Sequence, residues 1–443
     1  MHHRMDDPDK QVLWWRAQQA GLTRREFLRL LGVGGTAALL AACGTSQSQP
    51  QPSAPAASAA AQKRMFVKAE EPLIKVFATE LGTRWDQASE YITPIEQFYV
   101  RNRYASPVIE PQTWRLKISG DAIEQPLELS YDDLLNLPSR KAARYMECFG
   151  NGRTLNWEQL GYDVRGGNWG FSAISMGEWD YIPIGEILDR VKVKSSAKQL
   201  LFWSGVDGKD TGRPMPMTEV LARPDVIGLA HGLNSRPLHS DHGGPVRALV
   251  PGWGGAASVK WLTEIRISTQ QFWTRMHTKE EALIGKDYAA ERSDPRDEFL
   301  GVTPGDVQGI GATWLNVKSF LTIPLVMRTS EPPERYPLKQ GEVPVVAAGP
   351  RTMQGYASSP WGVQKVEYSV DGGSSWQEAR LVPPGGEEYS WVRFDFPWDA
   401  TPGSHVLMTR ATDKKGNTQP DTIPFNELGI LCNVVPKFEV LVK

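Results

Sequence analysis

Residues 143–153 read ARYMECFGNGR, and this stretch carries the strongest information about the fold and its site. An apolar-flanked, strand-like run ends at Cys148, a Gly-Asn-Gly turn follows, and Arg153 comes directly after the turn. A thiolate held on a turn beside a guanidinium suits a soft metal and an oxyanion together. A buried structural cysteine before a turn is the commoner occurrence, so this stretch alone leaves both interpretations open.

The last part of the chain, from about Asn316, has the pattern of an all-β domain. Short runs with alternating apolar residues are separated by turns, and Asp371-Gly372-Gly373 between two of them is a strong hairpin signal. Several short strands in succession favour a β-sandwich over residues 316–443. The expected strands are 363–370, 376–381, 389–396, 405–411 and 438–442.

The preceding part, from Met65 to about Thr269, mixes strand-like runs with short helices. Residues 113–118 alternate between apolar and polar side chains, and residues 131–137 follow Ser130, a good helix cap. We therefore predict an α+β protein in which a mixed domain at 65–300 precedes the β-sandwich. The polar, irregular stretch 270–315 is expected to connect the two.

Composition narrows the functional class. The 443 residues are 40% hydrophobic and 23% charged, which is ordinary globular composition with length for two or three domains. Lys and Arg number 49 against 51 Asp and Glu, so no basic excess points to nucleic acid. The three cysteines, Cys43, Cys148 and Cys432, have no spacing typical of a c-type haem or an iron–sulfur cluster.

Residues 1–43 have the features of an export signal. The paired arginines in 23–28 form the twin-arginine signature, and the Gly/Ala/Leu-rich run 30–42 is too short for a membrane span. The run ends in Leu-Ala-Ala-Cys, which resembles a lipobox with Cys43 as the acylated residue; an accidental cleavage site is the alternative. Residues 44–64 read as a flexible linker. We expect twin-arginine export to the periplasm, or another extracytoplasmic location, with a lipid anchor at the membrane.

Four further clusters carry side chains suited to anions. Each has an ordinary explanation by itself, such as a solvated arginine or a turn aspartate. Together, near a thiolate, they suit an anionic cofactor and an anionic substrate, since a lysine inside an apolar strand needs a counter-charge. The clusters are Phe98-Tyr99-Val100-Arg101-Asn102-Arg103, Asp207 near a strand end, His242 with Arg247 around a Gly-Gly-Pro turn, and Ser258-Val259-Lys260.

These motifs, in this order, resemble the sulfite oxidase family of molybdenum enzymes. The similarity rests on Cys-x-Gly-Asn-x-Arg at 148–153, His-Gly-x-Pro-x-Arg at 242–247 and Ser-Val-Lys-Trp-Leu at 258–262. Val-Asp-Gly-Gly at 370–373 resembles the family's immunoglobulin-like dimerisation domain. The resemblance covers nearly everything from Thr93 onward, and it implies a mixed molybdopterin domain followed by an immunoglobulin-like sandwich, usually as a homodimer.

The resemblance also implies roles for individual residues. Cys148 matches the thiolate that ligates molybdenum, and Arg101 and Arg153 match arginines that shape an oxyanion pocket beside it. One molybdenum–molybdopterin per chain is implied. The residues that match cofactor contacts are Phe98, Tyr99, Val100, Arg101, Asn102, Asp207, His242, Arg247, Ser258, Val259 and Lys260.

The chain departs from the family where substrate would bind. Gly152 stands where typical sulfite oxidisers carry a further arginine, and Leu428 stands in place of a third pocket arginine. Residues 273–281 contain no tyrosine, although the family's pattern expects one there. We therefore expect weak binding of sulfite or preference for a larger, less charged sulfur compound, unless Arg275 or His277 replaces the missing groups.

The implied reaction is two-electron oxygen-atom transfer to a sulfur compound. Because the chain has no haem motif, an external electron acceptor is implied, most plausibly a c-type cytochrome. The reverse reaction, reduction of sulfoxides or similar oxides, stays open. A rival from another class is a non-catalytic exported lipoprotein that uses the same fold for binding; Cys148 among so many anion-binding residues counts against it.

The N-terminal signal generates the first prediction. Replacing both Arg24 and Arg25 by lysine should leave the precursor in the cytoplasm, since the pathway reads the arginine pair. Cys43→Ala should reduce export or release the protein in soluble form. Immunoblots of cytoplasmic, membrane and periplasmic fractions measure both effects, and membrane attachment that survives Cys43→Ala contradicts the lipid anchor.

Overall fold

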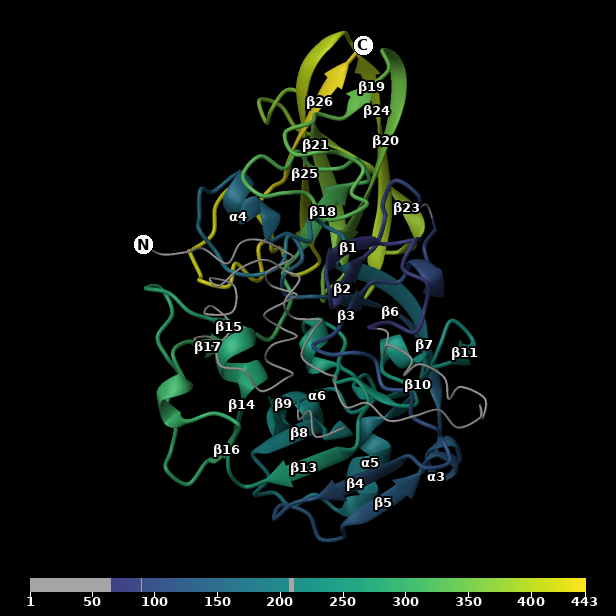
Figure 1. The fold of residues 1–443 in the computed structure, drawn as a ribbon, viewed down its shortest axis with the longest axis vertical. Helices are drawn as coiled ribbons and strands as arrows, with labels where there is room; N and C mark the ends of the chain where they lie inside the picture. The colour runs from purple at the N-terminus through teal and green to yellow at the C-terminus, as the bar shows by residue number, and fades with distance from the viewer. Residues whose placement is uncertain (1–64, 89, 207–210) are drawn as a thin grey trace, which may run out of the picture. The chain divides into compact units, whose positions relative to one another are not determined.

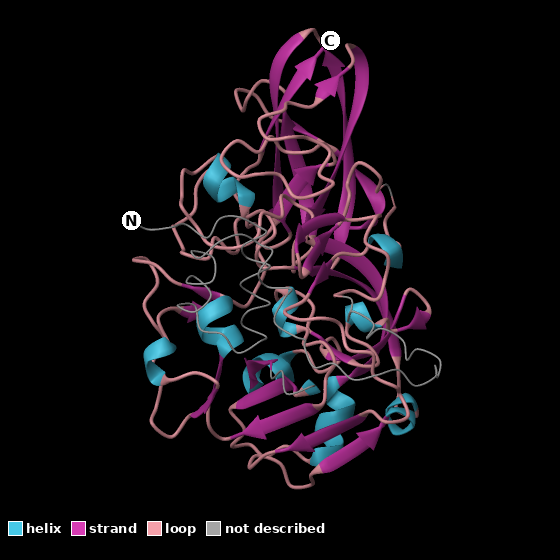
Figure 2. Ribbon diagram, viewed as in Figure 1, coloured by secondary structure: helices cyan, strands magenta, loops and turns pink. Residues whose placement is uncertain are grey.

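The computed structural model describes residues 65–88, 90–206 and 211–443 (Figure 1). Figure 2 shows that strands dominate these residues and that the helices are short. In the first part the strands are β1 Ile74–Phe77, β2 Glu80–Gly82, β3 Val100–Arg101, β4 Arg115–Ser119, β5 Leu127–Ser130, β6 Arg140–Glu147, β7 Ile174–Pro183, β8 Gln199–Ser204, β9 Thr211–Pro216, β10 Gly228–Leu233, β11 Arg236–Pro237, β12 Arg247–Leu249, β13 Glu264–Ser268, β14 Phe272–Thr274, β15 Ala282–Leu283, β16 Glu298–Leu300 and β17 Ile310–Gly311.

The remaining elements are the C-terminal strands and the helices. The strands are β18 Lys318–Leu321, β19 Val345–Val346, β20 Gly349–Ser358, β21 Val363–Ser369, β22 Gln377–Glu378, β23 Arg380–Gly385, β24 Trp391–Ala400, β25 Gly403–Asp413 and β26 Lys437–Val442. The α-helices are α3 Tyr131–Leu135, α4 Thr154–Glu158, α5 Ile184–Val191 and α6 Met217–Ala222. Short 3-10 turns are η2 Ile95–Gln97, η4 Ser240–His242, η5 Gly255–Ala257 and η7 Pro304–Asp306, and η6 Met276–Glu280 is a π-helical turn.

Two five-stranded sheets form the mixed domain. One has the order β11-β10-β7-β6, with β12 also paired to β10, and the other has the order β5-β4-β13-β8-β9. The predicted alternating strand is confirmed as β4, whose residues are alternately exposed and buried. The predicted helix is confirmed as α3, where Ser130 and Asp133 form a reciprocal capping box. A hydrophobic core of this domain packs strands β4 and β8 against α5, and it includes Leu116, Ile187 and Phe202.

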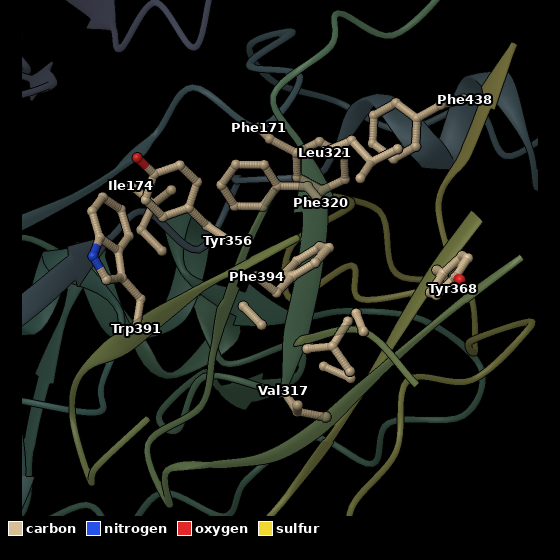
Figure 3. Packing of buried hydrophobic residues seen from close by; sticks show 14 of the residues in the cluster. Phe171, Ile174, Val317, Phe320, Leu321, Tyr356, Tyr368, Trp391, Phe394 and Phe438 are labelled. Carbon is tan, nitrogen blue, oxygen red and sulfur yellow. The ribbon is translucent and has the colours of Figure 1, made fainter. Parts of the chain in front are cut away.

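The C-terminal residues form the expected sandwich. Its sheets have the orders β18-β20-β24-β23 and β19-β26-β25-β21-β22. The hairpin predicted at the Asp-Gly-Gly turn is confirmed, since β21 and β22 pair antiparallel across it. Figure 3 shows inward-facing side chains such as Tyr368, Phe394 and Phe438 filling the space between strands. The predicted α+β architecture, with the mixed domain first and the sandwich second, is therefore confirmed.

The hydrophobic core continues across the predicted domain boundary. Phe171 and Ile174, from the mixed domain, belong to the same buried cluster as Phe320, Tyr356 and Trp391 of the sandwich (Figure 3). The Phe171 and Phe320 rings stack with their centroids 5.0 Å apart. Burial of this much aromatic surface is the main favourable term that holds the two parts together.

A buried ion pair joins the same two parts beside Cys148. Lys318, the first residue of β18, donates from Nζ to Glu147 Oε1 at 2.6 Å and to the Asn151 carbonyl at 2.7 Å. The side chains of Lys318 and Glu147 are only 4% and 0% exposed. Asn151 Nδ2 also donates to Glu147 Oε1. The sandwich thereby holds both sides of the loop that carries Cys148.

Residues 270–315, which the sequence predicts as an irregular connection, contain regular secondary structure. They form β14 to β17 and the turn η6, and β14 pairs in parallel with β16. Within the described residues, no helix is both long and apolar enough to cross a membrane.

The buried pair generates the second prediction. Lys318→Met should lower the free energy of unfolding by about 3–5 kcal/mol, because it leaves the Glu147 carboxylate buried without a counter-charge. Urea unfolding measures this loss, and adding Glu147→Gln should recover much of it. Arg380→Met, which breaks an exposed ion pair with Asp395 in the same sandwich, is the matched control and should move the midpoint little. Equal effects of the two single variants would contradict a special role for the buried pair.

Candidate active site

Cys148 is held on a rigid turn at the end of β6. Its amide donates to the Ala173 carbonyl at 2.9 Å, and its carbonyl accepts from the Asn151 amide at 2.9 Å. The Gly150 amide lies 3.4 Å from Cys148 Sγ and donates to it. The sulfur therefore has a fixed position and a backbone donor that favours its anionic form.

The Cys148 side chain lines a cavity that encloses about 790 Å³ of space free of protein atoms, including its open mouth. Strand ends and loops from distant parts of the chain meet here. The lining residues are Phe98, Tyr99, Arg101, Asn102, Arg103, Tyr104, Met146, Cys148, Thr211, His242, Arg247, Gly255, Ala256, Ser258, Val259, Lys260, Trp261, Met276 and Glu281.

The cavity lining contains several basic side chains, among them Lys260, Arg247 and His242, whose charge the neighbouring carboxylate of Asp241 offsets only in part. Lys260 Nζ donates to Asn102 Oδ1 and to the carbonyls of Arg101 and Asp241. Arg247 donates to the carbonyls of His242 and Ser258. Burial and the neighbouring positive charges lower the pKa of Lys260 and of His242 well below their usual values, and burial lowers that of Arg247 to about 10.

The carboxylate that acts on Lys260, that of Asp241, already accepts several hydrogen bonds from the protein. Asp241 accepts from the amides of Val67 and Lys68 and from the Ser106 hydroxyl. His242 Nε2 is buried without a hydrogen-bond partner among the described residues. A set of buried basic groups with one nearby carboxylate, and an unpaired ring nitrogen, fit an anionic ligand. The phosphate and polar pterin of molybdopterin would meet these requirements, and Cys148 would supply a thiolate to the metal.

The two arginines predicted for the substrate pocket occupy different positions. Arg101 lines the cavity, and its Nε lies 3.7 Å from Glu80 Oε1. Arg153 does not line the cavity; its guanidinium donates to the carbonyls of Leu428 and Gly167. Its charge still acts on the site, since Arg101 and Arg153 both oppose the rise in the Cys148 pKa. Burial has the larger effect, however, and raises the pKa of the metal-free Cys148 thiol to about 12. The negative charge of Glu281 is the second cause of this rise.

The absence of an arginine at position 152 has a local reason. Gly152 has φ +83°, a left-handed conformation in which a side chain is strained. A Cβ there would also lie 3.0 Å from the Cys432 carbonyl.

Neither replacement suggested for the missing tyrosine lines the cavity. Arg275 is paired with Glu280 and largely exposed, and His277 lies 3.3 Å from a Glu291 oxygen while stacking on Trp273. The same segment instead contributes Met276 and Glu281 to the lining. The sequence analysis did not identify Met276 or Glu281 as site residues. The available signal was the pair of glutamates at 280–281 at the end of the tyrosine-free stretch 273–281.

The other predicted residues divide into three groups. Most of the predicted cofactor contacts meet at the cavity, namely Phe98, Tyr99, Arg101, Asn102, His242, Arg247, Ser258, Val259 and Lys260. The Val100 side chain instead packs in a small core with Phe66, Leu73 and Leu81. Asp207 and Cys43 lie outside the described residues.

Comparison with known proteins is consistent with this geometry. Residues 103–276 match the model of the oxidoreductase molybdopterin binding domain, and residues 330–443 match that of the Mo-co oxidoreductase dimerisation domain. The mitochondrial sulfite oxidase of Homo sapiens is 30% identical over 369 residues, covering 80% of this chain and 62% of that protein. The chain thus spans about three fifths of the length of the mitochondrial relatives it matches.

Two further relatives and one solved structure extend the comparison. Arabidopsis thaliana sulfite oxidase is 27% identical, covering 77% of this chain and 86% of that protein, and the NADH nitrate reductase of Ulva prolifera is 28% identical, covering 76% and 39%. The crystal structure of the sulfane dehydrogenase SoxCD from Paracoccus pantotrophus has the same fold, with a TM-score of 0.65, 24% identity and coverage of 89% of this chain and 97% of that one. The prediction of a molybdenum–molybdopterin cofactor is confirmed by these matches, and the chain belongs to the sulfite oxidase family of molybdopterin oxidoreductases.

Proposed function

We propose that this protein oxidises a small sulfur compound by adding an oxygen atom that originates from water. The net change is sulfur compound plus water giving the oxygenated product, two protons and two electrons. The observation that carries the proposal is the fixed thiol of Cys148, set in a cavity whose lining also holds the buried basic groups of Lys260 and Arg247. The sulfite oxidases and the sulfane dehydrogenase among the related proteins support a sulfur substrate.

The chain's own residues supply binding, position and electrostatics. Cys148 holds the metal, while Lys260, Arg247 and His242 hold the anionic parts of the cofactor. When bound, molybdenum supplies oxygen-atom transfer and accepts two electrons. Arg101 lies on the lining beside Cys148 and is the group that attracts an anionic sulfur substrate.

We further propose the cellular setting. The electrons pass to an external acceptor, for which we propose a c-type cytochrome, because these 443 residues carry no haem motif. The match of residues 330–443 to a dimerisation domain supports a homodimer. The twin-arginine pattern and the lipobox at Cys43 support export and a lipid anchor outside the cytoplasm.

Reduction of an oxidised substrate is the second candidate. The observation that favours it is the similarity to nitrate reductase, an enzyme named for a reaction in the reductive direction. Steady-state assays decide between the two: sulfur oxyanions and thiols with cytochrome c or a dye as acceptor test oxidation, and sulfoxides or nitrate with a reduced dye test reduction.

The thiol of Cys148 generates the third prediction. Cys148→Ser should abolish turnover while the fold survives, because the hydroxyl is a far poorer ligand for a soft metal. Molybdenum should stay partly bound through the pterin. Turnover per molybdenum, metal analysis and circular dichroism measure the three quantities.

The chain offers a matched control for this variant. Cys432 is the other free cysteine of the described residues and is buried away from the cavity lining. Cys432→Ala should keep turnover per molybdenum close to that of the native protein. Full activity of Cys148→Ser would refute the assignment of the metal ligand.

A further inference from the structure

Glu281 is a carboxylate that the proposed chemistry has not yet used. It follows η6 directly and precedes β15, and its carbonyl accepts from the Ala312 amide at 2.8 Å. The residue is only 5% exposed, yet it lines the cavity together with Cys148. No donor among the described residues makes a hydrogen bond to its carboxylate, so the cavity is the only described place where that group could find one.

Arginines surround this carboxylate. Burial raises the pKa of Glu281, whereas Arg101, Arg153, Arg213 and Arg103 all act to lower it. Opposite charges at short range favour the ionised form of a carboxyl group. Arg213 donates to the carbonyls of Met276 and Ala312, on either side of Glu281 in the fold, and so helps to fix the backbone there.

Two arginines of the cavity lining, Arg101 and Arg103, already have carboxylate partners. Arg101 is within range of Glu80 and Glu281, and Arg103 forms an ion pair with Glu280. A substrate that enters the cavity meets the paired guanidinium groups of Arg101 and Arg103 together with the carboxylate of Glu281. Around Lys260 and Arg247, by contrast, Asp241 is the carboxylate that acts on Lys260.

We propose that Glu281 determines substrate charge at this site, selecting a sulfur compound with a single negative charge, such as an alkyl sulfinate, over the sulfite dianion. The inference rests on the proposed function. The reaction converts a sulfinate and water into a sulfonate, two protons and two electrons: one S–O bond forms, both O–H bonds of the water break, sulfur is oxidised, and the external acceptor is reduced by the two electrons. Glu281 would repel the second negative charge of sulfite while leaving Arg101 able to bind the first.

Anion binding tests this inference without turnover. Sulfate and methanesulfonate are unreactive and differ in charge, and isothermal titration calorimetry measures their affinity for the resting holoenzyme. We expect the native protein to bind methanesulfonate more tightly than sulfate at mildly alkaline pH. Because the repulsion scales with ligand charge, Glu281→Gln should tighten methanesulfonate about threefold and sulfate about tenfold.

Two variants control for fold and for general charge. Glu281→Asp keeps the charge and should keep the preference for the monoanion. Glu298→Gln removes a negative charge from an exposed residue paired with Arg266, away from the cavity lining, and should change neither affinity. A melting temperature that falls in Glu281→Gln with both affinities unchanged would mean a structural counter-ion and would overturn the inference, as would tighter binding of sulfate than methanesulfonate by the native protein.

Turnover distinguishes this inference from the proposed function. With an added acceptor dye, the native protein should oxidise methanesulfinate with a higher kcat/KM than sulfite, and Glu281→Gln should raise kcat/KM for sulfite about tenfold. If no sulfur compound is oxidised but sulfate binding tightens in Glu281→Gln, the proposed function fails and the role of Glu281 in selecting anion charge stands. If sulfite is oxidised well by the native protein and Glu281→Gln has no effect, the proposed function stands and the inference fails.

Discussion

The buried contact between Lys318 and Glu147 is the constraint on which the site depends most. Lys318 begins the sandwich, and Glu147 is the last residue of β6, directly before Cys148. The same amine binds the Asn151 carbonyl on the far side of the Cys148 turn. A desolvated ion pair tolerates little displacement, because either charge alone in that environment is costly. The C-terminal domain therefore does more than pack beside the cofactor domain: it sets the position of the thiol.

The cavity next to this contact is lined by two sets of charged side chains that differ in how far carboxylates offset them. Around Lys260, Arg247 and His242 the protein has buried cations and an unpaired ring nitrogen without supplying equivalent negative charge, which suits a permanently bound anion. Arg101 and Arg103, which also line the cavity, are paired with Glu80 and Glu280, and Glu281 adds a carboxylate to the lining.

Much of this arrangement was predictable from local patterns. Alternation identified β4, the serine cap identified α3, and an Asp-Gly-Gly turn between alternating runs identified the β21–β22 hairpin. The motifs around Cys148, His242 and Lys260 carried the resemblance to a molybdenum family, and their side chains do meet at one cavity. By contrast, the same reasoning took 270–315 for a mere connection, because short strands with polar, weakly alternating sequence give little signal.

The sequence by itself determined the fold class, the molybdopterin cofactor and the family, because each of these depends on residues close together in the chain or on short motifs. Tertiary structure decided which charges face the thiol. Arg153 turns to the carbonyls of Leu428 and Gly167, His277 stacks on Trp273, and Glu281 reaches the lining in their place. Which side chain of a polar segment points inward depends on backbone direction and on partners far away in sequence, and no local spacing specifies either.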